Sequence, residues 1–267
     1  MLKSTNCRFA LGAGLLYVGV ALACTQSAIA TTFINGNFET GNLNGWSSAG
    51  DVKAVAVATG IGFQAVLTNA AKTNQDDFPA STGALNVSGV DPLAVGSISG
   101  LDGFLNLSSY LVANGTSLLD LASLSATEGS AISQSINLSA GETLSFLWDF
   151  ATADNVEGDY AFVLINGQKA VLANLLNSNP NASLMNPLIS NTGQQLYSFT
   201  AIASGAYAVA VGLVDVNDFG SSSMLTVGEF AVSAVPEPSQ WAAIVAGLFL
   251  VSRFVKRSQA KGTTPAV

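Results

Sequence analysis

The stretch YAFVLINGQKAVL, residues Tyr160–Leu172, decides the fold. An apolar run leads into Asn166-Gly167, and a second apolar run follows at once. Asn-Gly favours two-residue hairpin turns because both central residues of such a turn need positive φ angles. The stretch therefore predicts two antiparallel strands, Tyr160–Ile165 and Gln168–Leu172, joined by a tight turn.

Similar short runs, apolar or alternating, lie on both sides of this hairpin and are separated by turn-forming residues. Strands with this spacing are typical of an all-β fold, an antiparallel β-sandwich. No repeat of fixed period indicates a solenoid. The other expected strands are Val52–Ala58, Gln64–Leu67, Ala131–Leu138, Thr143–Ala151, Gln195–Ala201, Ala206–Val214 and Leu225–Ser233.

Two segments do not follow this pattern. Pro92–Leu124 has irregularly spaced leucines, which predict either a short helix with a loop laid over the sandwich or further strands. Asn174–Asn191 is polar and contains two prolines, so we expect a surface loop there.

The N-terminus has the pattern of an export signal. Lys3 and Arg8 precede the apolar stretch Phe9–Ala23, and Ala28-Ile29-Ala30 has the small-x-small form of a cleavage site. We predict a signal peptide over residues 1–30, removed by signal peptidase. The alternatives are an uncleaved membrane helix and a lipoprotein signal ending at Cys24.

The mature chain lacks two chemically versatile residue types. Both cysteines, Cys7 and Cys24, lie inside the predicted signal, and the sequence has no histidine. Disulfides, thiol nucleophiles and Cys-based metal sites are therefore excluded from the mature chain. Ser-His-Asp and Cys-His catalysis and His-ligated metals are excluded as well.

Charge is unevenly distributed along the chain. The span Glu39–Glu237 holds all 17 acidic residues but only Lys53, Lys72 and Lys169 as bases, which gives a net charge of −14. Basic ends around an acidic middle fit the positive-inside rule for a translocated middle segment. The negative charge argues against nucleic acid as a partner and leaves cations as plausible ligands.

The C-terminal segment, residues 235–258, has three elements in fixed order. Pro236-Glu237-Pro238 is followed by the apolar run Trp241–Val251 and then by basic residues, which are Arg253, Lys256 and Arg257. This order resembles the PEP-CTERM sorting signal of exopolysaccharide-producing Gram-negative bacteria. The resemblance implies recognition by an exosortase, cleavage near the Pro-Glu-Pro, and delivery to the cell surface or to the extracellular matrix of a biofilm.

The length of the apolar run bears on how it meets the membrane. Eleven residues span only about 16 Å as a helix, against a bilayer core of roughly 30 Å. The run therefore predicts a transient or marginal anchor in the inner membrane. An ordinary transmembrane tail anchor is the alternative.

Residues 31–234 remain as one predicted domain. Asn35–Gly41 (NGNFETG), followed by Gly45-Trp46, resembles the opening of galactose-binding-like jelly-roll modules. Three further stretches are similar to a domain of anchored bacterial surface proteins; they are Ala126–Ile132, Leu144–Phe150 and Asp159–Val163. The resemblance implies a jelly-roll-like sandwich at the cell surface; it does not imply a catalytic role.

In such jelly rolls, the opening acidic residue and one on the last strand often hold a structural calcium ion. Glu39 and Glu229 match these positions, so the resemblance implies that they are calcium ligands, with a solvated or hydrogen-bonded Glu229 as the alternative; we expect no other cofactor. Calcium takes six to eight oxygen ligands, and backbone carbonyls would supply the rest. A second acidic group comprises Asp149, Asp154, Glu157 and Asp159, and we expect a polar loop there, with metal binding as the alternative.

The first of the function classes that remain is a non-catalytic surface module that binds exopolysaccharide or matrix glycan. Aromatic residues that could stack on sugars are Trp46, Trp148, Tyr110 and Tyr197, of which both tryptophans are expected to have structural roles. The second class is a secreted polysaccharide hydrolase with paired carboxylates, which needs no histidine. A structural matrix protein is the third. We predict the first, with no catalytic residue.

Overall fold

The computed structural model describes residues 32–57, 62–72, 85–96, 106–115, 125–154, 158–174, 179–180, 188–217, 221–234 and 247. Contacts within the chain define a compact unit from Ile29 to Val235, called the body below. The predicted signal peptide lies outside the described residues, and so does the sorting segment apart from Gly247, including Pro236, Glu237, Pro238, Arg253, Lys256 and Arg257.

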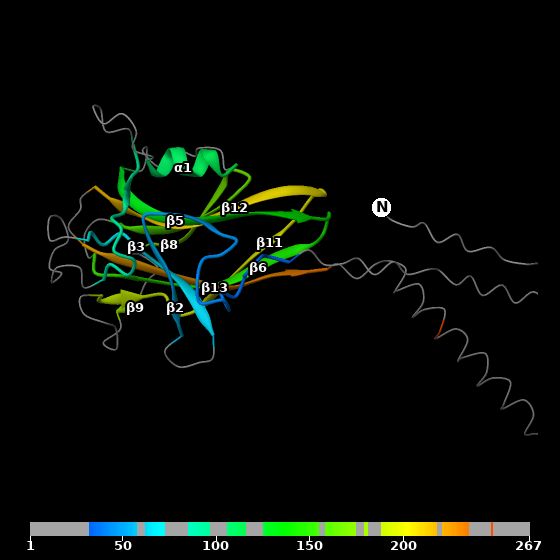
Figure 1. The fold of residues 1–267 in the computed structure, drawn as a ribbon, viewed down its shortest axis with the longest axis horizontal. Helices are drawn as coiled ribbons and strands as arrows, with labels where there is room; N and C mark the ends of the chain where they lie inside the picture. The colour runs from blue at the N-terminus through cyan, green and yellow to red at the C-terminus, as the bar shows by residue number, and fades with distance from the viewer. Residues whose placement is uncertain are drawn as a thin grey trace, which may run out of the picture. The chain divides into compact units, whose positions relative to one another are not determined.

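The body is a sandwich of two antiparallel sheets (Figure 1). Sheet A has the order β1-β5-β12-β7-β8, with β4 also beside β5. Its strands are β1 (Ser47–Ala49), β4 (Leu93–Ala94), β5 (Ala126–Leu138), β7 (Tyr160–Ile165), β8 (Gln168–Asn174) and β12 (Gly205–Val216). The all-β sandwich predicted from the sequence is confirmed.

Sheet B has the order β2-β3-β13-β6-β10-β9, and β11 also pairs with β6. Its strands are β2 (Asp51–Ala56), β3 (Phe63–Thr68), β6 (Thr143–Thr152), β9 (Asn179–Pro180), β10 (Ser190–Asn191), β11 (Gln195–Thr200) and β13 (Ser223–Ser233). The short strands β9 and β10 pair with each other inside the segment expected to be a loop.

The predicted hairpin is confirmed. Ile165 pairs with Gln168, and Asn166 and Gly167 both have positive φ angles, 47° and 78°. The expected strand at Ala131 begins five residues earlier, at Ala126. The other predicted strands agree with the structure to within two residues at each end.

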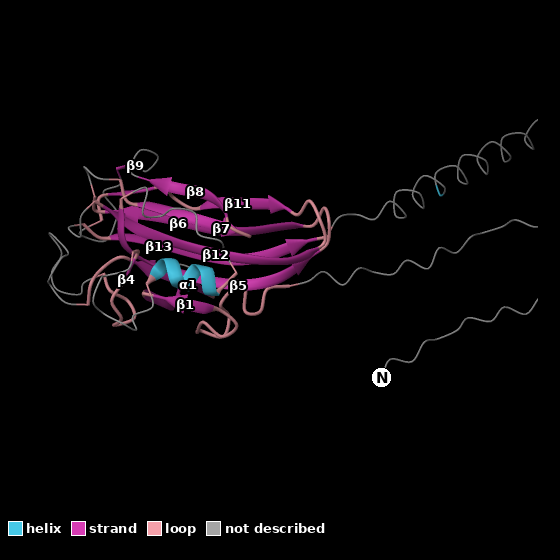
Figure 2. Ribbon diagram, turned by 90° about the horizontal axis from the view of Figure 1, so that it is seen from above, coloured by secondary structure: helices cyan, strands magenta, loops and turns pink. Residues whose placement is uncertain are grey.

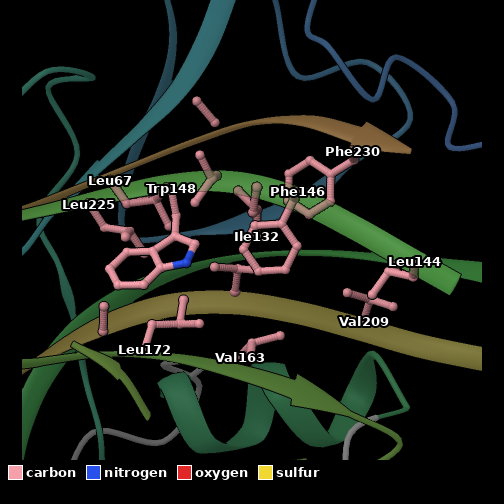
Figure 3. Packing of buried hydrophobic residues seen from close by; sticks show 14 of the residues in the cluster. Leu67, Ile132, Leu144, Phe146, Trp148, Val163, Leu172, Val209, Leu225 and Phe230 are labelled. Atoms are coloured by element: carbon pink, nitrogen blue, oxygen red, sulfur yellow. The ribbon is translucent and has the colours of Figure 1, made fainter. Parts of the chain in front are cut away.

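The main core lies between the sheets (Figure 3). Along β6, buried side chains alternate with half-exposed ones from Thr143 to Phe150, as a strand with one face on a core requires. Phe146 and Phe150 are fully buried, as are Leu225 on the neighbouring strand β13 and Leu67 on β3, the next strand of the sheet. Each such side chain contributes about 1.5–3 kcal/mol through burial, so the packing between the sheets stabilises the sandwich.

A short helix, α1 (Leu107–Ala113), covers the outer face of sheet A (Figure 2). Asn106 caps it by accepting a hydrogen bond from the Ser109 amide at 2.7 Å. Its buried residues pack with outward-facing side chains of the sheet in a second core. Of the two predictions for residues 92–124, the helix laid over the sandwich is correct for 107–113 and a further strand is correct for Leu93–Ala94, while 97–105 and 116–124 lie outside the described residues.

Candidate functional site

The two tryptophans of the body are core residues. Trp46 stacks on Phe33 with ring centroids 5.6 Å apart, lies 4.6 Å from the Phe230 ring, and donates its indole N–H to the Asn35 carbonyl at 3.1 Å. Trp148 projects inward from β6 into the core between the sheets (Figure 3). The structural roles expected for both are confirmed, so neither is a surface for stacking sugars.

The two tyrosine candidates are also engaged in packing. Tyr110 is buried on α1, and its hydroxyl lies 3.0 Å from the Ser133 hydroxyl. Tyr197, on β11, is half-buried with its ring 5.1 Å from that of Phe146. Among the described residues no aromatic side chain is exposed. Binding through the described part of the chain would therefore rely on polar groups.

Glu39 and Glu229 come from two segments that the structure brings together. The Phe230 amide donates to the Gly36 carbonyl at 3.0 Å, and the Phe230 ring meets the Phe38 ring edge-on at 6.2 Å. Glu229 has a φ of 56° and sits in a β-bulge where it and Phe230 both lie opposite Phe146. Both glutamates are exposed.

This arrangement bears on the implied calcium ion. Within the described residues no group of three or more Asp, Glu, His or Cys side chains is placed to hold a metal. Two exposed carboxylates on adjoining segments are compatible with a hard cation only if backbone carbonyls complete the ligand set.

The second acidic group is divided by the structure. Asp154 and Asp159 are buried, with 5% and 2% of their surface exposed, whereas Asp149 is half-exposed on the outer side of β6. Glu157 lies outside the described residues. Asp154 and Asp159 lie in the connection between β6 and β7, where a polar loop was expected, but their side chains are buried.

Asp159 connects the two sheets. One carboxylate oxygen accepts from the Val216 amide at 3.2 Å, in sheet A. The other accepts from the Ser223 hydroxyl at 2.6 Å and from the Asn69 side chain at 3.0 Å, at the strand ends of sheet B. Burial, together with the nearby Asp154 carboxylate, raises the pKa of Asp159 to about 7, although these hydrogen bonds act to lower it.

Asp51 is a second buried anchor, which the sequence did not indicate. It is fully buried, and its carboxylate accepts from the hydroxyls of Thr68 and Ser88 and from the amides of Val87 and Ser88. These hydrogen bonds connect β2 to β3 and to the segment that contains Val87 and Ser88. Asp51 and Asp159 are thus structural carboxylates without access to a solvent-borne substrate.

The outer face of sheet B is the best candidate for a binding site. Its central row crosses four strands in register, with Lys53 opposite Val66, Val66 opposite Thr226, and Thr226 opposite Asp149. Lys53 is exposed, and Thr226 and Asp149 are half-exposed. The only helix among the described residues of the body, α1, lies on the other sheet (Figure 1).

The next row differs in having a glycine at its centre. Gly228 lies between Gln64 on β3 and Leu147 on β6, and Leu147 faces Leu196 on β11. A Cβ at Gly228 would touch Gln64 only at ordinary contact distance, 3.7 Å. Gly228 is itself buried, and the row around it offers the half-exposed Gln64 and Leu147 and the exposed Leu196.

Asp149 is the carboxylate of the central row. It accepts a hydrogen bond from the Thr192 hydroxyl at 3.2 Å. Burial raises the pKa of Asp149, while hydrogen bonds from Thr192 and from the Gly193 backbone lower it. The face therefore offers a carboxylate, an ammonium group, an amide and hydroxyls. The polar alternation of these strands was visible in the sequence, but not the register that aligns them.

Comparisons with known proteins show no matching family model and no matching curated protein. Among solved structures, the chain is similar to the carbohydrate-binding module TmCBM61 in complex with β-1,4-galactotriose, at 12% identity and a TM-score of 0.37, covering 76% of this chain and 99% of that one. A CBM4 structure matches at 13% identity and a TM-score of 0.30, covering 72% and 95%.

The enzymatically active domain of tailspike protein 4 from bacteriophage CBA120 matches at 11% identity and a TM-score of 0.28. That match covers 74% of this chain but only 21% of the tailspike chain. At these identities and TM-scores we take no functional conclusion from the three likenesses. In the described part of the chain, no helix has the length and apolar character needed to cross a membrane.

Proposed function

We propose that this protein is an exported, non-catalytic protein of the cell surface or extracellular matrix, and that it binds glycan through the outer face of sheet B. The observation that carries the proposal is the central row of that face, in which the exposed Lys53 and the half-exposed Thr226 and Asp149 align on either side of the buried Val66. Sugar hydroxyls both donate and accept hydrogen bonds, and these side chains offer both kinds of partner.

The environment of the buried carboxylates supports a role without catalysis. Glycoside hydrolysis needs two carboxylates on either side of the scissile bond. Asp51 and Asp159 are at most 2% exposed, and their oxygens hold backbone and side-chain donors of the framework. Hydrolysis remains the alternative function, and the binding experiment below includes a direct test of it.

Export and sorting complete the proposal, and they rest on the sequence. The signal peptide would direct the domain of residues 31–234 across the inner membrane. The Pro236-Glu237-Pro238 segment would then be recognised by an exosortase while Trp241–Val251 holds the chain transiently at the membrane. Replacement of Pro236 and Pro238 by alanine should leave the protein in the membrane fraction; normal release of this variant would contradict the sorting proposal.

A structural calcium ion at Glu39 and Glu229 is part of the same proposal. The support is the bulge at Glu229 and the backbone hydrogen bond from Phe230 to Gly36, which hold the two acidic segments together. The ion would tie the opening turn to the last strand. It would have no role in chemistry on a substrate.

The test is a glycan array with residues 31–234, followed by affinity measurements on single variants. Lys53→Ala, Gln64→Ala and Thr226→Ala remove groups of the outer face, whereas Val112→Ala changes an exposed residue of α1. We expect the face variants to weaken binding about tenfold each, the magnitude of one lost polar contact, and Val112→Ala to have no effect. Equal binding by all variants would refute the site, and release of reducing ends from the bound glycan would favour the hydrolase.

A further inference from the structure

Strand β11 forms an edge of sheet B. It pairs with β6 along its whole length, from Gln195 opposite Trp148 to Thr200 opposite Thr143. On its other side no strand of the described residues pairs with it. A free edge presents unpaired N–H and C=O groups that another strand can bind.

The β11 edge lacks the features that usually prevent an edge strand from pairing with another chain. Natural edge strands carry charged residues, proline or bulges that prevent pairing with another chain. The β11 sequence, QLYSFT, has no charge and no proline, and its pairing with β6 shows no shift of register. Leu196, on the outer side, is 65% exposed. Among the described residues, β11 is therefore a regular strand whose outer edge has no partner strand.

The charge distribution indicates which partner. The chain has no charged residue from Ala170 to Val214, a segment that supplies all of β11 and most of β12, although the span Glu39–Glu237 carries −14. Two copies of so acidic a protein repel each other wherever carboxylates approach within about 8 Å, the screening length at physiological salt. Contact along β11 brings together the part of the chain that has no charge.

We propose that β11 is a self-association edge, and that two copies of this chain pair their β11 strands antiparallel about a two-fold axis to join two B sheets into one. A two-fold axis makes the same patch meet itself. With the axis at Ser198, Leu196 lies opposite Thr200 of the second copy, and Tyr197 lies opposite Phe199 of the second copy. Opposed residues of antiparallel strands share a face, so this register pairs the inward aromatic residues with each other.

The position of the axis follows from the side chains. With the axis at Ser198, the small serine side chain lies opposite the same serine of the second copy. Centring the axis on Tyr197 would oppose two tyrosines and set Phe199 against Gln195. The proposal does not depend on glycan binding, although a dimer of this kind would place two outer faces on one continuous sheet.

Disulfide trapping tests the register. The full chain, with Cys7 and Cys24 replaced by serine and kept in a mild detergent, receives Ser198→Cys or, as the matched control, Ser145→Cys. Ser145 is the neighbour of Ser198 on β6. At the axis the two Cα atoms of residue 198 would lie about 4.5–5.5 Å apart, a distance that a disulfide accepts. We expect a covalent dimer from Ser198→Cys under oxidising conditions and none from Ser145→Cys.

Sedimentation velocity tests the association itself. We expect the wild-type chain to form dimers at micromolar concentration and Ser198→Glu to be monomeric, because two carboxylates would face each other at the axis; circular dichroism verifies that the variant is folded. Association through the apolar ends of the chain would persist in Ser198→Glu. A monomeric wild type, a dimer unaffected by Ser198→Glu, or equal cross-linking of Ser145→Cys would each overturn the proposal.

Discussion

Asp159 should make the stability of the body decrease as pH rises. Burial and the neighbouring Asp154 raise the pKa of Asp159 from 3.8 to about 7. Between these two values the folded state holds a proton that the unfolded chain has released. The free energy of unfolding therefore falls as pH rises from about 4 to about 7, and the contribution of Asp159 is constant on either side of this window.

The size of this effect follows from the pKa difference. About three pKa units at 1.36 kcal/mol each give an upper value of about 4 kcal/mol. A domain is typically stable by only 5–15 kcal/mol, so the change should be easy to measure. The pKa of Asp149 is also raised, so its contribution has the same sign, and a single-residue comparison is needed to isolate Asp159.

The assay is urea unfolding of residues 31–235 at several pH values from 4 to 8.5, followed by the fluorescence of the buried Trp46 and Trp148. Asp159→Asn keeps an oxygen for the Val216 amide but cannot ionise. We expect the stability advantage of the wild type over this variant to shrink by up to about 4 kcal/mol from pH 4 to pH 8. Asp154→Asn should move the decline to lower pH. A difference between wild type and Asp159→Asn that stays constant across the range would refute the reasoning.

The remaining predictions concern packing and the proposed ion. Gly212→Ala in β12 places a Cβ 2.6 Å from the Ser130 carbonyl oxygen and should lower the free energy of unfolding by about 1–3 kcal/mol. The control is Gly205→Ala, at the start of the same strand, where a Cβ would have no atom within 4 Å. Equal urea midpoints for the two variants would contradict this packing argument. EDTA should lower the melting temperature of the wild-type body and leave that of Glu229→Gln unchanged. If calcium has no role at Glu39 and Glu229, both melting curves will be unaffected by the chelator.

The strands could be predicted well from the sequence because a turn signal or an alternating pattern depends only on residues that are adjacent in the chain. Asn166-Gly167 sets the turn, and apolar alternation sets the faces of β6. The helix α1 was harder to predict: Leu107, Tyr110 and Leu111 have helical spacing and Asn106 is a good cap, but seven residues are too few to distinguish a helix from a strand by periodicity.

Most of the candidate site could not be predicted from the sequence. Lys53, Thr226 and Asp149 are far apart along the chain, and only the pairing of β2, β3, β13 and β6 aligns them. Asp51 gave no signal because its donors come from Thr68 and from the Val87-Ser88 pair. The choice of the tryptophans as structural residues was correct, since aromatic residues near strand and turn signals usually pack inward.

The place of β13 in the fold has a mechanical consequence. This last strand lies inside sheet B, bonded to β3 on one side and to β6 on the other, and it ends at Ser233, just before the sorting segment. Hydrogen bonds of an antiparallel ladder run perpendicular to the strands. A pull along β13 from the C-terminal side therefore shears many bonds at once instead of opening them one after another. A chain held by its tail would transmit tension into the strand that is best placed to resist it.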